Sequence, residues 1–175
     1  LVARVADGES LARFTNEGGA FGGFEWIGPK RLAFLHRPVP AGDPDEDRRL
    51  EASAQTLWVL DLAVDPPRLE ARYAVLEGQS LDRMAANAAG ALVFRARQAE
   101  GSGIAVLGPT EAAPSFYPAR ADWPRLSPDG RQATFSTGNE IAVMDLPGGR
   151  TRALTDNRVR DRYPFFAHDG ARVFY

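Results

Sequence analysis

The chain has 175 residues, of which 44% are hydrophobic and 25% are charged, and this composition fits one globular domain with an ordinary core. Its net charge of −2 excludes the strong basic field that nucleic-acid binding uses. The absence of cysteine excludes disulfides and cysteine-based metal or redox chemistry. We expect no membrane-spanning helix and no signal peptide, because the sequence has neither an apolar run of about 18 residues nor a basic segment leading into an apolar one.

Glycine and proline make up about 17% of the chain, against a usual share of about 12%. This excess predicts many short strands joined by tight turns. The first two strands are expected within residues 1–15, on either side of Asp7-Gly8. Laid on residues 141–155 without a gap, this stretch matches in kind, so we interpret residues 1–23 as the second half of a four-stranded unit.

Residues 24–80 form the next predicted unit. Gly28-Pro29-Lys30 takes the hairpin position between its first two strands, and its third strand begins at Thr56. Residues 37–55 are rich in proline and charge, and we interpret them as an exposed loop inserted between the second and third strands. Carboxylates alternate within residues 43–47, but the loop lacks the glycine and glutamate of an EF-type calcium site, so no metal is expected there.

Residues 81–122 form a more degenerate unit. The alanine-rich stretch 80–91 could suggest a helix. Asn87 and Gly90, however, fall where a hairpin turn is expected, and Leu92-Val93-Phe94 continues as a second strand. The pattern therefore predicts a hairpin here.

The clearest unit covers residues 123–163, and half a unit follows at 164–175. Ser127-Pro128-Asp129-Gly130 is a turn, because proline presets φ, aspartate bonds to the local backbone and glycine adopts a positive φ. The turn returns at Asp169-Gly170, 40 residues later. A period of about 40 to 45 residues is typical of β-propeller blades.

The Ser-Pro-Asp-Gly turn, with the apolar strands that follow it, Glu140–Leu146 and Arg152–Thr155, resembles the WD-like repeat of TolB-type β-propellers. The same kind of repeat builds the N-terminal propellers of prolyl oligopeptidase-family serine peptidases. The resemblance implies an all-β fold of four-stranded antiparallel blades, with about four blade equivalents present. We expect a segment of a six- to eight-bladed ring. The alternative is a closed four-bladed ring in which the two terminal halves combine into one blade.

The resemblance also implies two functions. The first is a non-catalytic protein-interaction or scaffold propeller similar to TolB, located in the bacterial periplasm and binding a protein or peptide on a propeller face or in the channel. The alternative is the substrate-gating propeller of a cytoplasmic prolyl oligopeptidase-type peptidase, whose triad lies in a separate α/β-hydrolase domain. A weaker third option is a channel that is itself a catalytic or metal site.

We predict no catalytic residue, cofactor or metal ligand in this chain. Nucleophilic hydrolysis needs an activated serine or cysteine beside a base, and the only histidines are His36 at a strand end and His168 in a turn. Asp61 and Asp145 each follow a third strand, and we expect them to make turn and inter-strand hydrogen bonds.

One polar cluster is the candidate partner-binding site. It joins the last strand of one unit to the first strand of the next, and in propellers of this type such connections lie near the channel mouth. Arginine and tyrosine are frequent binding hot spots. The alternative is an ordinary surface loop whose arginines pair with nearby acids. The candidate residues are Arg158, Arg160, Asp161, Arg162 and Tyr163.

The aromatic side chains could suggest a stacking platform for nucleic acid, for which the acidic balance provides no electrostatic attraction. Their periodic placement on predicted strands favours packing between blades. The residues concerned are Trp26, Trp58, Trp123, Phe135, Phe165, Phe166 and Phe174.

Overall fold

The computed structural model describes residues 2–3, 10–12, 19–38, 55–75, 78–99, 101–156 and 159–175. Within those ranges every regular element is a β-strand. The part of the chain that is described contains no helix long and apolar enough to cross a membrane.

Three four-stranded antiparallel sheets follow one another along the chain, and each is a simple meander. Blade 1 contains β3 (Gly19–Gly28), β4 (Arg31–Pro38), β5 (Thr56–Asp61) and β6 (Arg68–Ala74). Blade 2 contains β7 (Ser80–Ala86), β8 (Leu92–Gln98), β9 (Gly101–Leu107) and β10 (Ser115–Pro118). Blade 3 contains β11 (Asp122–Leu126), β12 (Gln132–Thr137), β13 (Glu140–Asp145) and β14 (Arg150–Ala153).

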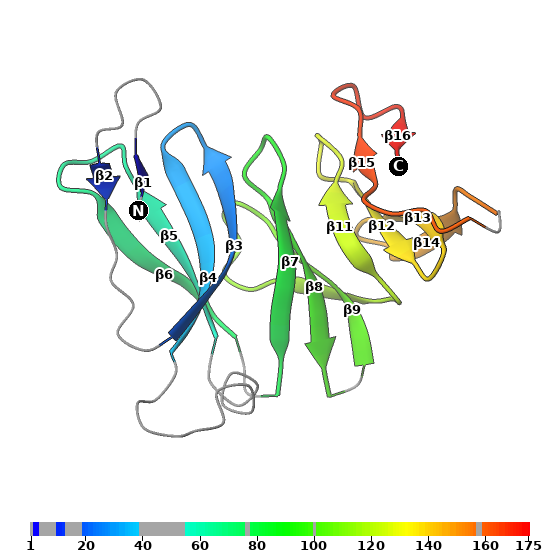
Figure 1. Cartoon of the computed structure of the whole chain (residues 1–175), viewed down its shortest axis with the longest axis horizontal. Coiled ribbons are helices and arrows are strands. Elements are labelled where there is room, and N and C mark those ends of the chain that lie inside the picture. The colour runs from blue at the N-terminus through cyan, green and yellow to red at the C-terminus, as the bar shows by residue number, and fades with distance from the viewer. Residues whose placement is uncertain are drawn as a thin grey trace.

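Two strand pairs flank these blades. β1 (Val2–Ala3) pairs with β2 (Ser10–Ala12), and β15 (Phe165–Phe166) pairs with β16 (Val173–Phe174). The two pairs belong to separate sheets and lie at opposite ends of the row of blades (Figure 1). The terminal halves therefore do not combine into one blade, and the arrangement is that of an open propeller segment. β15–β16 is called the C-terminal half blade below.

The predicted turns form through local hydrogen bonds. In blade 3, the Ser127 hydroxyl donates to the Asp129 carboxylate at 2.6 Å, and the Arg131 amide donates to the same carboxylate at 3.0 Å. These two hydrogen bonds lower the pKa of Asp129. Gly130 completes the turn with a φ of +71°.

Asn87 performs the same task in blade 2. Its side-chain oxygen accepts hydrogen bonds from the amides of Ala89 and Ala91, and Gly90 has a φ of +80°. Residues 80–91 therefore form strand β7 and a turn, which confirms the prediction of a hairpin over a helix. The side-chain Nδ2 of Asn87 also donates to the Ser127 carbonyl at 3.3 Å and so joins the turns of neighbouring blades.

Successive blades pack face to face through apolar side chains. Alternate residues of β8 point to opposite sides, so that Phe94 packs in the cluster shared with blade 1 and Val93 in the cluster shared with blade 3. Leu57 of blade 1 and Phe135 of blade 3 belong to these same two clusters and are almost fully buried. The first strands β3, β7, β11 and β15 contact one another in turn, which makes them the inner strands of the propeller.

The aromatic residues divide into three groups. Phe135 is buried as expected, and Trp58, Trp123 and Phe166 are partly buried. Trp26, Phe165 and Phe174 are about half exposed, at 51%, 52% and 47%, so the expectation of packing between blades is wrong for them. The reason is their position in the row of blades. Trp26 lies on β3 of blade 1, and Phe165 and Phe174, whose ring centroids are 5.3 Å apart, stack in the C-terminal half blade. Each residue is therefore at an end of the row and not between two full blades.

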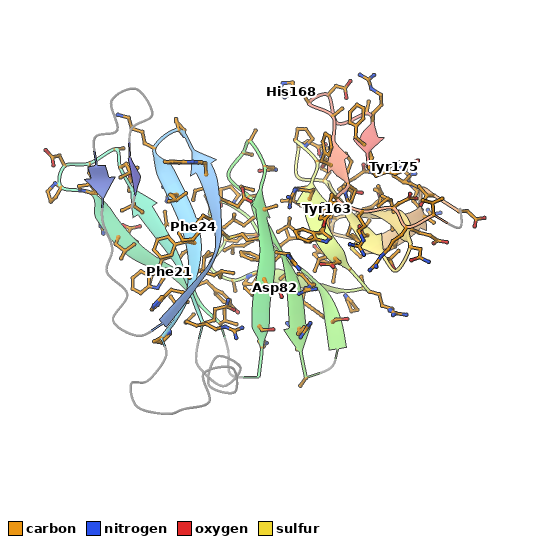
Figure 2. The ribbon with its side chains drawn as sticks, in the orientation of Figure 1. Phe21, Phe24, Asp82, Tyr163, His168 and Tyr175 are labelled. Carbon is orange, nitrogen blue, oxygen red and sulfur yellow. The ribbon has the colours of Figure 1, made fainter. Side chains whose placement is uncertain are left out.

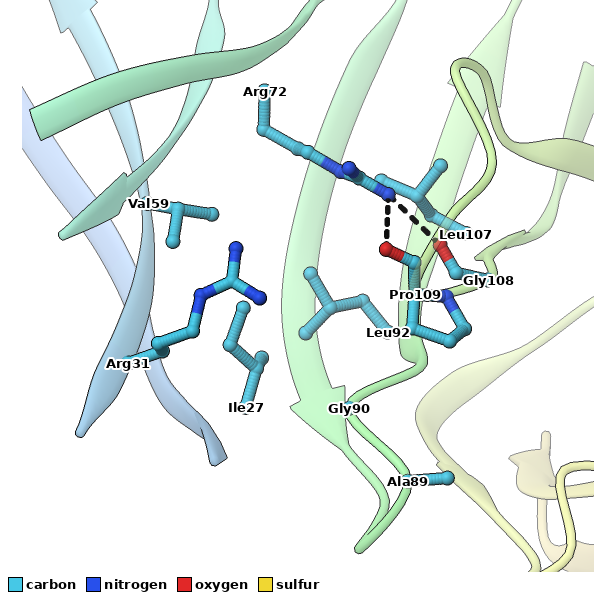
Figure 3. Close-up of a pocket in the computed structure, with 10 residues that line it drawn as sticks. All are labelled: Ile27, Arg31, Val59, Arg72, Ala89, Gly90, Leu92, Leu107, Gly108 and Pro109. Atoms are coloured by element: carbon cyan, nitrogen blue, oxygen red, sulfur yellow. Dashed lines mark hydrogen bonds between the residues drawn. The ribbon is translucent and has the colours of Figure 1, made fainter. Parts of the chain in front are cut away.

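A cavity of about 80 Å³ lies between blades 1 and 2, beside Ile27, Leu92 and Gly90. Arg72 of β6 lines it and reaches across to the loop that follows β9 (Figure 3). Its Nη2 donates to the carbonyls of Gly108, Pro109 and Glu111 at 3.1, 2.7 and 2.8 Å. Because the guanidinium satisfies the loop carbonyls, this contact serves to join the two blades.

Candidate ligand-binding site at the inner rim

The structure brings three of the five predicted site residues to one cavity. Arg160, Arg162 and Tyr163 line a hollow of about 390 Å³, which we call the rim cavity. Asp161 is not among the lining residues, and its amide donates to the Asn139 carbonyl at 3.0 Å. Arg158 lies outside the described residues.

The opposite wall of the rim cavity comes from blades 2 and 3, and sequence reasoning missed it. Arg83 comes from β7, Asp122 and Trp123 from the start of β11, and Ser136 from the end of β12. Figure 2 shows Tyr163 beside β11 and His168 at the far tip of the C-terminal hairpin. The cavity is therefore lined by the inner strands β7 and β11, the end of β12 and the segment that leads into β15.

A left-handed backbone conformation recurs along the inner strands and beside the rim cavity. Gly23, Arg83, Trp123 and Tyr163 have φ values of +58°, +50°, +53° and +57°. Arg83, Trp123 and Tyr163 are spaced 40 residues apart, and each of the first three positions lies at a register shift in its inner strand. A left-handed backbone is strained for any residue except glycine, and strained residues cluster at functional sites.

Three of these left-handed residues bring their side chains together across the blades. The Arg83 guanidinium lies 3.8 Å from the centroid of the Trp123 ring, a cation–π contact. The Tyr163 ring meets Trp123 edge-on, with centroids 4.6 Å apart. Tyr163 is 55% exposed, so the row Arg83–Trp123–Tyr163 presents an aromatic and cationic surface to solvent.

An ionic link lies directly behind this row. Arg95 donates through Nε to Asp82 at 2.6 Å and through Nη1 to Asp122 at 3.2 Å, and so connects blade 2 to blade 3. The hydrogen bond to Asp82 and the charges of both carboxylates raise the pKa of Arg95 above its usual value. Asp122 lies in addition 3.7 Å from Arg83. The one carboxylate that lines the cavity is thus already paired with two arginines.

Arg160 and Arg162 differ from these groups. Both are exposed, and neither has an ion pair or hydrogen bond within the described ranges. With Arg83, three arginines line the cavity against one aspartate. The rim cavity therefore has a positive balance that favours anionic groups.

The remaining candidate residues show no catalytic geometry. His168 is exposed, and the His36 ring packs 4.9 Å from Phe21. As expected from the sequence, Asp61 accepts a hydrogen bond from the Ala63 amide at 2.8 Å, and Asp145 accepts one from the Gln132 side chain at 2.7 Å. Across the residues whose placement is described, no three His, Asp or Glu side chains gather closely enough to hold a metal ion.

No protein-family model matches the chain, and no curated protein sequence matches it. Among solved structures the chain is similar to TolB from Acinetobacter baumannii, with 16% identity and a TM-score of 0.59 over 99% of this chain and 41% of that one. The putative TolB from Agrobacterium tumefaciens gives 18% identity and a TM-score of 0.52 over 89% of this chain and 69% of that one.

A third similar structure is the β-propeller domain of the trilobed protease from Pyrococcus furiosus, with 10% identity and a TM-score of 0.52 over 81% of this chain and 44% of that one. The chain spans less than half the length of the A. baumannii TolB. At identities this low the likeness shows the fold and no more. The chain therefore has a TolB-like β-propeller fold, which confirms the prediction from its Ser-Pro-Asp-Gly repeat.

Proposed function

We propose that this protein is a non-catalytic protein-interaction propeller and that its inner rim binds a protein or peptide partner. The observation that carries the proposal is the row Arg83–Trp123–Tyr163, in which Arg83 and Tyr163 are exposed, beside the cavity arginines Arg160 and Arg162. Tryptophan, tyrosine and arginine are the residue types most enriched at binding hot spots. Strained backbone at all three positions of the row further supports a role in binding over a purely structural one.

Site-specific photo-crosslinking tests this proposal in the full-length protein in its own cells. A photoreactive amino acid replaces Tyr163 at the rim, and a matched variant carries it at Arg152, an exposed residue of the outer strand β14. We expect a reproducible protein adduct from position 163 alone. The partner identified from that adduct is then purified, and its binding is expected to be lost in Tyr163→Ala and kept in Arg152→Ala. Adducts of equal yield at both positions would contradict a rim site.

The similarity to the P. furiosus protease propeller supports a second candidate, in which the chain gates substrate entry to a serine peptidase. Treatment of the full-length protein with a fluorophosphonate probe separates the two candidates. Labelling of a serine outside this propeller supports gating, and the absence of labelling supports the interaction role.

The TolB likeness leads us to propose a periplasmic location for the interaction role, whereas the gating role is cytoplasmic. Fractionation of cells with antibodies to the full-length protein tests the location. Release with the periplasmic fraction agrees with the first candidate, and retention with cytoplasmic markers agrees with the second.

A further inference from the structure

The junctions on the two sides of blade 3 are built from equivalent positions. In blade 2, Asp82 lies opposite Arg95 in the register of β7 and β8. In blade 3, Asp122 lies opposite Ser136 in the register of β11 and β12. Asp82 and Asp122 each directly precede a residue with a left-handed backbone. The next residue in this place is Arg162, which lies 40 residues after Asp122 and directly precedes Tyr163.

At the junction of blades 2 and 3, the Arg95 guanidinium fills the space between Asp82 and Asp122. At the next junction, between blade 3 and the C-terminal half blade, Ser136 takes the place that Arg95 has in blade 2. A serine side chain is far too short to reach from one blade to the next. The rim cavity of about 390 Å³ lies at this point, with Ser136 and Arg162 among its lining residues. The cavity is thus open where the preceding junction has an arginine side chain.

Ser136 also carries an unsatisfied polar group. The residue is 5% exposed, and its Oγ has no hydrogen-bond partner among the described residues. A buried hydroxyl without a partner costs free energy, and native structures contain few of them. The surface of this Oγ is closed to a water-sized atom, so the hydroxyl is not a donor to a ligand in the rim cavity.

Charge and shape define the ligand. Asp122 is already paired with Arg83 and Arg95, while Arg160 and Arg162 carry charges that no described residue neutralises. A planar carboxylate matches the paired donors of a guanidinium. Trp123 and Tyr163 provide an apolar wall for the chain that carries the carboxylate.

We propose that the rim cavity is a carboxylate receptor, in which Arg162 and Arg160 bind a glutamate or aspartate side chain, or the C-terminal carboxylate, of a peptide segment of the partner. This inference rests on the proposed interaction function and assigns its chemistry. The two guanidinium groups donate to the carboxylate oxygens.

NMR on the purified full-length protein tests this assignment. The indole N–H signal of Trp123 reports on the cavity, while those of Trp26 and Trp58, which do not line it, serve as internal controls. The probes are the blocked peptide Ac-Ala-Ala-Glu-Ala-Ala-NH2, its glutamine analogue, a peptide with a free C-terminal carboxylate, and inorganic phosphate. We expect the glutamate peptide to shift the Trp123 signal selectively and to bind at least tenfold more tightly than the glutamine peptide.

Three variants locate the binding group. Ser136→Arg restores the side chain found at Arg95 and is expected to fill the cavity and abolish binding. Arg162→Gln changes an exposed side chain, so its folding is not in question, and it is expected to weaken binding of the glutamate peptide about tenfold. Arg97→Gln, exposed on β8, is the matched control and is expected to have no effect.

Equal binding of the glutamate and glutamine peptides, or unchanged binding in Arg162→Gln, overturns the carboxylate assignment. Tighter binding of inorganic phosphate than of either carboxylate peptide overturns it in favour of a phosphorylated ligand. A photo-adduct at position 163 that persists in either case leaves the interaction function standing while this inference fails. If neither the photo-adduct at position 163 nor the selective binding of the glutamate peptide is observed, the interaction function and the carboxylate assignment both fail.

Discussion

The guanidinium of Arg83 lies 3.8 Å from the centroid of the Trp123 ring, across the junction of β7 and β11. Such a contact at a largely exposed site stabilises a protein by about 0.5–1 kcal/mol. Arg83→Ala removes this contact and also the 3.7 Å ion pair with Asp122, which contributes less than about 1 kcal/mol at this exposure. It is therefore expected to lower the free energy of unfolding by about 0.5–2 kcal/mol, measured by urea denaturation. Arg97→Ala, exposed one strand away, is the control and should change the free energy by less than about 0.5 kcal/mol.

Tyr163→Gly separates stability from binding. Glycine removes the strain of a φ of +57°, worth about 1 kcal/mol, and the loss of the ring contact with Trp123 costs a similar amount. We expect the free energy of unfolding to change by less than about 1 kcal/mol while partner binding is lost. A large loss of stability together with binding would instead make Tyr163 a structural residue.

Gly23→Ala tests the same backbone position in the opposite direction. Gly23 has a φ of +58°, and a Cβ added to it would lie 3.1 Å from the Cβ of Met84. Alanine is therefore expected to lower the free energy of unfolding by about 1 kcal/mol or more. Gly22→Ala is the matched control, because a Cβ there meets nothing within 4 Å and its φ is not in the left-handed region.

Arg72 should contribute more to stability than any isolated surface arginine. It donates to three loop carbonyls, and hydrogen bonds from charged groups are among the stronger ones. Arg72→Ala is expected to lower the free energy of unfolding by about 2 kcal/mol, measured by urea denaturation. Arg68→Ala on the same strand removes only an exposed ion pair with Glu70 and should cost less than about 1 kcal/mol.

Glu25 gives a pH-dependent prediction. Burial raises its pKa above the usual 4.5, against the opposing effects of the Arg125 charge and a hydrogen bond from the Ala86 backbone. The folded state therefore binds the proton more tightly than the unfolded state does. As pH rises from below 4.5 to neutral, the wild type should lose stability relative to Glu25→Gln. Urea denaturation of both proteins across this range measures the difference, and a gain in relative stability would contradict the raised pKa.

Local chemistry made the blades predictable. Asp129-Gly130 and Asn87 with Gly90 each form the turn that their residue types predicted, because the side-chain oxygen and the glycine backbone act within a few residues. The exposure of Trp26 and Phe165 was not predictable from alternation along a strand. It depends on which sheet lies against each face, and that is set by the order of blades in space.

The candidate site was likewise predictable only in part. The cluster that ends in Arg162 and Tyr163 was recognisable as polar and aromatic residues between two units, and the 40-residue spacing back to Trp123 and Arg83 is also present in the sequence. That these side chains meet follows only from the left-handed backbone at each position and from the packing of successive inner strands.

The sequence by itself determined the repeat, the turns and the propeller fold, because each depends on neighbours in the chain and on their period. Only the tertiary structure decided that Ser136 would replace an arginine bridge and leave a cavity, because the consequence of that change depends on residues from two different sheets and from the segment that leads into a third. Contacts between blades join residues far apart in the chain, and their geometry is set by the packing of whole sheets.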